Sequence, residues 1–70
     1  MFGDRLRKLR KEHNLSQEEL ANLVHVHTNT ISSWENGVIP NMSKIIDLAR
    51  ILGTTSIYLL GETDGAGGEY

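Results

Sequence analysis

The stretch SQEELANLVHVHTNTISSWENG, residues 16–37, predicts two short helices joined by a tight turn. Ser16 is followed three residues later by Glu19, which is the spacing of a capping box, where the two side chains accept free amide hydrogens at a helix start. We therefore expect a helix to begin at about Gln17. Its apolar residues recur on one face, which predicts that this face is buried: Leu20, Ala21 and Val24.

A second helix is predicted after a phase break in this apolar pattern. Ile31 and Trp34 restart the helical spacing, and either His27 or Thr28 can cap the new helix. We expect Gly37 to end it, because a residue without a side chain readily adopts the left-handed conformation that closes many helices. An aromatic side chain at this spacing is usually part of a core, so we expect Trp34 to be buried.

The exposed face of this second helix carries only short, uncharged side chains that form hydrogen bonds. A helix face with this chemistry can enter a groove and exchange hydrogen bonds at its floor. We call this set of residues the polar face: Thr28, Asn29, Ser32 and Ser33.

The length of 70 residues predicts one domain of modest stability, because a chain this short buries only roughly 60% of its unfolded surface. Without cysteine, the core must come from aliphatic packing rather than from disulfides or a cysteine zinc site. The apolar runs are too short to span a membrane, and the N-terminal MFGDRLRKLRK lacks the apolar core of a secretion signal. We therefore expect a cytoplasmic protein without membrane contact.

The charge is unevenly distributed along the chain. Nine acidic and seven basic residues give a net charge of −2, whereas many domains that bind nucleic acid are basic. Residues 1–13 hold five basic and two acidic side chains, a local charge of +3. Three of the acidic residues fall in the last nine positions, so the domain without them is slightly positive, which permits phosphate binding.

The N-terminal segment predicts a first helix over about residues 4–13. Its apolar stripe is Phe2, Leu6, Leu9 and His13, at helical spacing. Asp4 is available as the cap, with a favourable charge near the positive end of the helix. The cations that fall off the stripe, Arg5 and Lys11, are expected to lie on a solvated face.

The C-terminal half predicts two more helices and a tail. Pro40 stops continuation and Asn41 caps a helix over 42–52, which we expect to be mostly core. Its apolar residues are Met42, Ile45, Ile46, Ala49 and Leu52. After Gly53, Thr55 caps a short fifth helix that ends at Gly61. We predict one domain over 1–60, followed by a disordered glycine-rich acidic tail or linker over 61–70.

Two segments, SQEELANLV (16–24) and TISSWENG (30–37), resemble the phage-repressor and Cro type of helix-turn-helix DNA-binding domain, the XRE family. The resemblance covers about residues 4–60. It implies an all-α, compact, five-helix fold like that of lambda repressor, in which helices 2 and 3 form the helix-turn-helix. The third helix, about residues 28–36, would be the recognition helix.

The resemblance also implies roles for individual residues. In the family, an arginine at the position of Arg10 pairs with a glutamate at the end of the recognition helix, which Glu35 matches. The residue at the position of Gln17 bonds the DNA backbone and can support a base contact, and the residue at Asn36 donates to a phosphate. Where the family usually has glycine, often with a positive φ angle, this chain has His25.

The family places its base contacts on the face that here is the polar face. Asparagine can bond adenine through two hydrogen bonds, and the threonine methyl can touch the thymine methyl. The commonest guanine contact is missing, because this helix has no arginine or lysine, and His27 is expected to supply a donor instead. Lys44 and the cations of the first helix are candidates for phosphate contacts.

These features predict a sequence-specific transcriptional regulator, expected to be a repressor, that binds double-stranded DNA as a homodimer. Dimers of this motif class place their recognition helices about 34 Å apart, which predicts a pseudo-palindromic operator with half-sites about 10–10.5 base pairs apart. We expect the dimer contacts at Ile57, Tyr58 and the loop at Val38 and Ile39.

The alternative is a protein-interaction module with the same fold, such as an antitoxin or a domain bound by an antagonist protein. The acidic balance and the apolar Val38 and Ile39 favour it. A metal site is not expected, because His25 and His27 have no carboxylate cluster or thiol nearby in the sequence. No enzymatic activity or cofactor is expected, because the serines lack a glycine elbow and an orienting acid.

Overall fold

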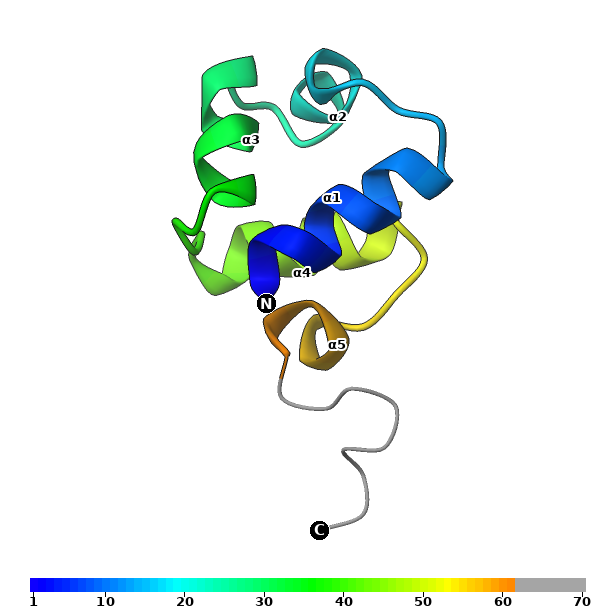
Figure 1. Cartoon of the computed structure of the whole chain (residues 1–70), viewed down its shortest axis with the longest axis vertical. Coiled ribbons are helices and arrows are strands. Elements are labelled where there is room, and N and C mark those ends of the chain that lie inside the picture. The colour runs from blue at the N-terminus through cyan, green and yellow to red at the C-terminus, as the bar shows by residue number, and fades with distance from the viewer. Residues whose placement is uncertain (62–70) are drawn as a thin grey trace, which may run out of the picture.

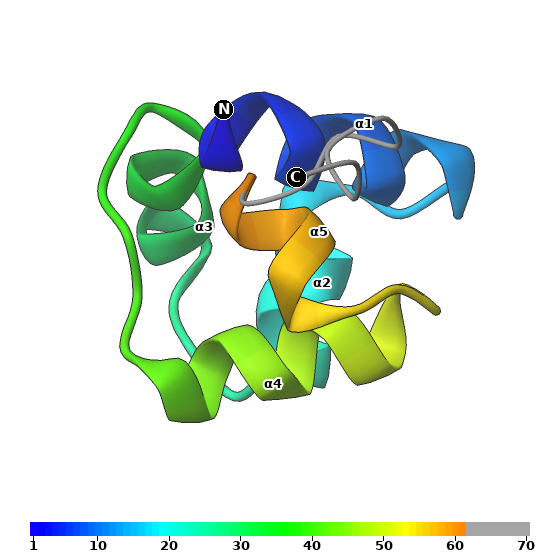
Figure 2. The same ribbon diagram turned by 90° about the horizontal axis from the view of Figure 1, so that it is seen from below.

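The computed structural model describes residues 1–61, which form five α-helices and no strand (Figure 1). In chain order they are α1 (Phe2–Glu12), α2 (Gln17–Leu23), α3 (Thr28–Glu35), α4 (Met42–Ile51) and α5 (Ser56–Leu60). Helix α3 packs against both α2 and α1, and α5 packs against both α4 and α1. Figures 1 and 2 both show the N-terminal end of α1 beside α5. The expected all-α fold of five helices is confirmed.

All five helices contribute to a single apolar core. Each supplies at least one side chain with no exposed surface: Leu6, Leu20, Ile31, Leu48 and Leu59. Trp34 is buried in the same cluster, as expected. Because α3 is anchored in this core on one side only, its other side is left for solvent or a ligand.

The predicted capping residues start three of the helices. Ser16 Oγ accepts from the amide of Glu19 at 3.0 Å, and Glu19 Oε1 accepts from the amide of Ser16 at 2.8 Å, which completes the capping box. Asn41 caps α4 and Thr55 caps α5 through similar bonds to backbone amides. His27 is the N-cap residue of α3, but its side chain makes no capping hydrogen bond.

The first helix begins earlier than the sequence pattern predicted. Met1 is its N-cap residue, and Asp4 lies inside the first turn, so the prediction of Asp4 as the cap is wrong. Asp4 still has a favourable place near the positive end of the helix. His13 follows the end of α1 and is exposed, so it does not belong to the buried stripe.

Two predicted core residues of α4 are exposed. Met42 is 51% and Ile46 is 44% exposed, whereas Leu48, which the prediction omitted, is fully buried. The buried stripe of α4 continues into the residue after it: Ile45, Leu48, Ala49 and Leu52. This spacing is that of one narrow helix face, and Met42 and Ile46 lie beside it.

Glycines follow the ends of three helices. Helix α3 ends at Glu35 with Asn36 as its C-cap, and Gly37 comes next with a φ of 120°. Gly61 is the left-handed C-cap of α5, as predicted.

The predicted tail lies outside the described residues from position 62 onward. Within residues 1–61, no helix is long and apolar enough to cross a membrane.

Candidate nucleic-acid interface

The turn between α2 and α3 has the backbone conformation that the sequence led us to expect. His25 adopts a φ of 62°, the left-handed region in which the family usually has glycine. Lys44 Nζ donates to the carbonyl oxygen of Val24 at 2.8 Å, so α4 is tied to the C-terminal end of α2. The Lys44 ammonium group, predicted to contact phosphate, is therefore engaged inside the protein and half-buried.

The polar face of α3 is accessible. Thr28, Asn29 and Ser33 are exposed and Ser32 is half-buried, whereas Ile31 and Trp34 on the other side of the helix are buried. No hydrogen bond joins the four polar side chains to any other residue in 1–61. His27 is exposed at the N-terminal end of the same helix. The chain thus presents a row of unused donors and acceptors on a firmly anchored helix.

Glu35, the last residue of α3, joins three helices through its carboxylate. Arg10 of α1 donates to it twice, from Nε to Oε2 at 2.6 Å and from Nη2 to Oε1 at 3.3 Å. Gln17 of α2 donates from Nε2 to Oε1 at 3.1 Å. Arg7 of α1 donates from Nε to the same Oε1 at 3.4 Å. The structure thus contains the Arg10–Glu35 pair that the resemblance implied, within a larger network.

The ionisation of Glu35 is set by two opposing effects. Burial disfavours the charged carboxylate, since only 2% of its side chain is exposed. The hydrogen bonds from Arg10 and Gln17 and the charge of Arg10 outweigh this effect and hold the pKa of Glu35 below its ordinary value. Glu35 is therefore ionised at neutral pH and keeps its partners in place.

The amides of both predicted backbone-contacting residues make internal hydrogen bonds. Gln17 uses its amide nitrogen on Glu35, and Asn36 uses its own on the carbonyl oxygen of Ser32 at 2.9 Å. A side-chain amide has two hydrogens on its nitrogen, so each residue keeps one donor for another partner. The internal bonds fix the direction in which that donor points.

Two arginines of α1 have partners that sequence reasoning missed. Arg5, expected on a solvated face, is half-buried, donates from Nη1 to the carbonyl oxygen of Tyr58 at 2.6 Å and lies over the Tyr58 ring at 4.7 Å. Arg7 was not singled out, although it is one turn before Arg10 and therefore shares its face of the helix. That three-residue spacing was the available signal.

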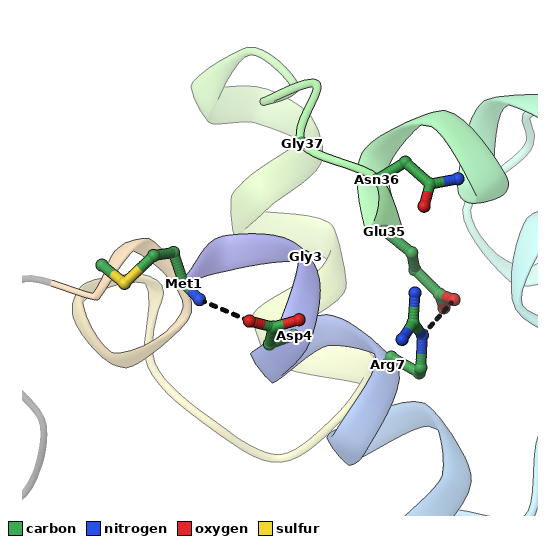
Figure 3. Close-up of a pocket in the computed structure, with 7 residues that line it drawn as sticks. All are labelled: Met1, Gly3, Asp4, Arg7, Glu35, Asn36 and Gly37. Atoms are coloured by element: carbon green, nitrogen blue, oxygen red, sulfur yellow. Dashed lines mark hydrogen bonds and ion pairs between the residues drawn. The ribbon is translucent and has the colours of Figure 1, made fainter.

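A shallow hollow of about 340 Å³ lies between the start of α1 and the end of α3 (Figure 3). Its lining includes Arg7 of α1, Glu35 at the end of α3, and the two residues that follow, Asn36 and Gly37. Asp4 also lines it and bonds the terminal amine of Met1 at 3.0 Å. The hollow is open and mainly polar, so its chemistry suits a charged ligand group at the surface.

The described histidines and carboxylates do not form a metal site. Residues 1–61 contain no cluster of three or more side chains of the kinds that hold a metal ion. His25 and His27 are both exposed at the turn.

The sequence profile of the helix-turn-helix family matches residues 6–59 of this chain. The matched segment runs from the first buried leucine of α1 to the buried leucine of α5, so it covers α2, α3 and α4 completely and most of α1 and α5. The chain belongs to the helix-turn-helix family, and the resemblance stated from the sequence is confirmed.

Several curated proteins are similar to the chain. It is 35% identical over 65 residues to the uncharacterised HTH-type transcriptional regulator YobD of Bacillus subtilis, covering 91% of this chain and 58% of YobD. It is 34% identical over 65 residues to the cryptic phage CTXphi transcriptional repressor RstR of Vibrio cholerae, covering 91% and 59% of the two chains. It is 38% identical over 48 residues to antitoxin PezA of Streptococcus pneumoniae, covering 69% and 30%. The chain thus spans little more than half the length of YobD and RstR.

Two solved structures share the fold. The biofilm regulator SinR, in a crystal structure with DNA, superposes with a TM-score of 0.79 at 29% identity, over 86% of this chain and 98% of that chain. The DNA-binding domain of the P22 c2 repressor superposes with a TM-score of 0.82 at 30% identity, over 100% and 95%. Both structures support the assignment of the lambda-repressor-like fold.

Proposed function

We propose that this chain is the sequence-specific DNA-binding domain of a cytoplasmic transcriptional repressor, with α3 as the helix that enters the major groove. The polar face is the main support for this proposal. Its four side chains can form hydrogen bonds but make none within residues 1–61, and they lie on the outer side of a helix anchored by Ile31 and Trp34. Base edges in the major groove present donors and acceptors that such side chains can match. SinR, which shares the fold, was solved in complex with DNA.

Within this proposal, Asn29 and its three polar-face neighbours contact bases, with His27 beside them. The remaining donors on Gln17 and Asn36 contact the backbone. Backbone contacts position a protein without specifying sequence, whereas base contacts carry the sequence preference. Lys44 keeps further N–H groups for a phosphate, but the main role of its bond to Val24 is to stabilise the turn between α2 and α3.

We further propose that the chain binds its operator as a two-fold dimer. Three of the predicted dimer contacts, Val38, Ile39 and Ile57, are more than half exposed, as is Met42, whereas Tyr58 is half-buried. A contiguous patch of such side chains would be typical of a surface that meets another protein. A second copy fits this surface, because half-sites on two-fold symmetric DNA require two recognition helices in the same arrangement.

Selection of bound oligonucleotides from a random duplex library tests this function. We expect enrichment of a pseudo-palindrome whose half-sites are about 10–10.5 base pairs apart. A selection that enriches no sequence, together with no gel shift at low salt, would contradict the proposal. A pull-down with purified cognate toxin or antagonist would then test the second candidate.

The second candidate is a protein-interaction module of the same fold. The exposed apolar loop at Val38 and Ile39 favours it, as does the similarity to the antitoxin PezA. The free polar face of α3 favours DNA, because a surface that binds protein usually has an apolar centre. We therefore place DNA binding first.

A further inference from the structure

We propose that Arg7 is a DNA-contacting residue, and that its guanidinium group binds a backbone phosphodiester at the hollow between α1 and the end of α3. This inference rests on the proposed function and selects one cation of α1, whereas the sequence indicated the cations of the first helix only as a group. It follows from the excess of positive charge around Glu35, from the position of Arg7 beside two other backbone candidates, and from its exposure.

The carboxylate of Glu35 does not need Arg7. Arg10 makes two hydrogen bonds to it, the shorter at 2.6 Å, and Gln17 makes a third at 3.1 Å. The bond from Arg7 Nε is the longest of the set, at 3.4 Å. One negative charge thus faces two guanidinium groups, so the network carries one surplus positive charge.

That surplus charge lies at the surface on Arg7. The Arg7 side chain is 44% exposed, whereas that of Arg10 is 11% exposed. Arg7 uses Nε for Glu35, and neither terminal nitrogen makes a hydrogen bond to another residue in the described part of the chain. Two parallel N–H groups on a planar guanidinium match two oxygens of a phosphate.

The position of Arg7 puts it among the donors proposed for the DNA backbone. Arg7 and Gln17 donate to the same oxygen, Glu35 Oε1, so their polar ends lie side by side. Arg7 and Asn36 line the same hollow (Figure 3). Asp4, which also lines it, has its charge balanced by the terminal amine. The Glu35 carboxylate, which also lines the hollow, is paired with Arg10, so a phosphate there would meet the guanidinium group of Arg7 beside the neutral amide of Asn36.

The bond to Glu35 also prepares Arg7 for binding. An arginine free in solvent samples many rotamers and loses that freedom when it binds a ligand. The Nε bond to a buried carboxylate restricts the side chain beforehand and keeps Arg7 at the hollow. Lys8, the next residue, is exposed and has no such partner among the described residues.

The test compares Arg7→Gln, Arg7→Lys and the matched control Lys8→Gln on the duplex that the wild-type chain selects and on a mixed-sequence duplex of equal length. Each association constant is measured from about 50 to 200 mM salt. Losing one phosphate contact per subunit should make the slope of log K against log salt shallower by about 1.8 for a dimer. The loss caused by Arg7→Gln should thus shrink by about tenfold over this fourfold range of salt.

We expect Arg7→Lys to keep most of the slope and Lys8→Gln to keep all of it, with every variant folded by circular dichroism. If Arg7→Gln lowers affinity equally at all salt concentrations, Arg7 only supports Glu35 and the proposal is overturned. Equal slope changes for Arg7→Gln and Lys8→Gln would overturn it too, because they would indicate a diffuse charge effect. If the wild type binds no duplex at all, the proposed function itself fails, and the Arg7 contact with it.

Discussion

Glu35 shows how a single residue can fix the position of α3. Its carboxylate is buried at the end of α3 and receives hydrogen bonds from α1 and α2. A buried charge is costly unless it is fully paired, so the three helices can adopt only arrangements that bring these partners together. The network therefore fixes the direction of α3 relative to the helix that precedes it in the motif.

The contribution of the Arg10–Glu35 pair can be measured by a double-mutant cycle. Replacing Arg10 with methionine should lower the free energy of unfolding by about 1–3 kcal/mol, because Glu35 loses its two bonds from Arg10 but retains those from Gln17 and Arg7. Urea unfolding of Arg10→Met, Glu35→Gln and the double variant supplies the coupling. A coupling energy indistinguishable from zero would show that the pair does not stabilise the fold.

Asn29 should affect recognition without affecting stability. Because it is exposed and unpaired within residues 1–61, Asn29→Ala should change the free energy of unfolding by no more than about 0.5 kcal/mol. Loss of a two-bond adenine contact should cost about 1–3 kcal/mol per half-site and relax the preference at one base position.

Oligonucleotide selection with wild type and Asn29→Ala checks this, and Gln17→Ala provides the contrast. A backbone contact should weaken binding evenly across sequences, so Gln17→Ala should leave the selected base frequencies unchanged. Identical base frequencies for wild type and Asn29→Ala, with a uniform loss of affinity, would make Asn29 a positioning residue. The reading role would then pass to His27.

At the scale of the elements, local signals in the sequence were sufficient to predict most helix starts. The capping box at Ser16 and Glu19 and the caps at Asn41 and Thr55 involve residues three apart, so the sequence displays both partners. The positive φ of His25 was also expected, because the family usually has glycine at this position.

The predictions failed where a distant element decides the outcome. Periodicity places Met42 and Ile46 near the apolar face of α4, but only the packing of α5 and the other helices determines how wide the covered stripe is. Arg5 was expected to be solvated because its partner, the carbonyl oxygen of Tyr58, lies 53 positions later. The Arg7 contact with Glu35 likewise spans 28 positions, and its only local signal is the three-residue spacing between Arg7 and Arg10.

The contact between α1 and α3 depends on Gly3. A Cβ atom there would lie 2.3 Å from the carbonyl oxygen of Glu35 and 3.0 Å from that of Trp34, both of them backbone atoms that cannot move aside easily. Gly→Ala inside a helix normally gains about 0.5–1 kcal/mol. Here Gly3→Ala should instead lower the free energy of unfolding by about 1–3 kcal/mol, because it forces the two helices apart.

Thermal or urea unfolding tests this reversal, with Lys8→Ala as the control on the same helix. The exposed control should change the free energy of unfolding by at most about 0.5 kcal/mol. Unchanged or increased stability of Gly3→Ala would show that α1 and α3 can separate at little cost. In that event the Glu35 network would not depend on close contact between the two helices.

At the scale of the whole molecule, the charge distribution determines how the domain should bind DNA. The chain has seven basic residues and a net charge of −2. Three of the cations have their charged groups committed inside the protein: Arg5 on Tyr58, Arg10 on Glu35 and Lys44 on Val24. The net charge of −2 makes long-range attraction to DNA weak, and the internal bonds of these three cations leave neutral hydrogen-bond donors to supply much of the positioning.

This charge distribution predicts that DNA affinity depends only weakly on the salt concentration. Each phosphate neutralised contributes about −0.9 to the slope of log K against log salt, so one or two cationic contacts per subunit give about −2 to −4 for a dimer. Fluorescence anisotropy with the selected duplex at several salt concentrations measures the slope. A value steeper than about −8 needs about five cationic contacts per subunit, so Lys8, Lys11 and Arg50 would have to reach phosphates and Lys44 would have to leave Val24 on binding. Release of Lys44 predicts that Lys44→Gln makes the slope shallower, whereas the bond to Val24 in the structure predicts a less stable domain with an unchanged slope.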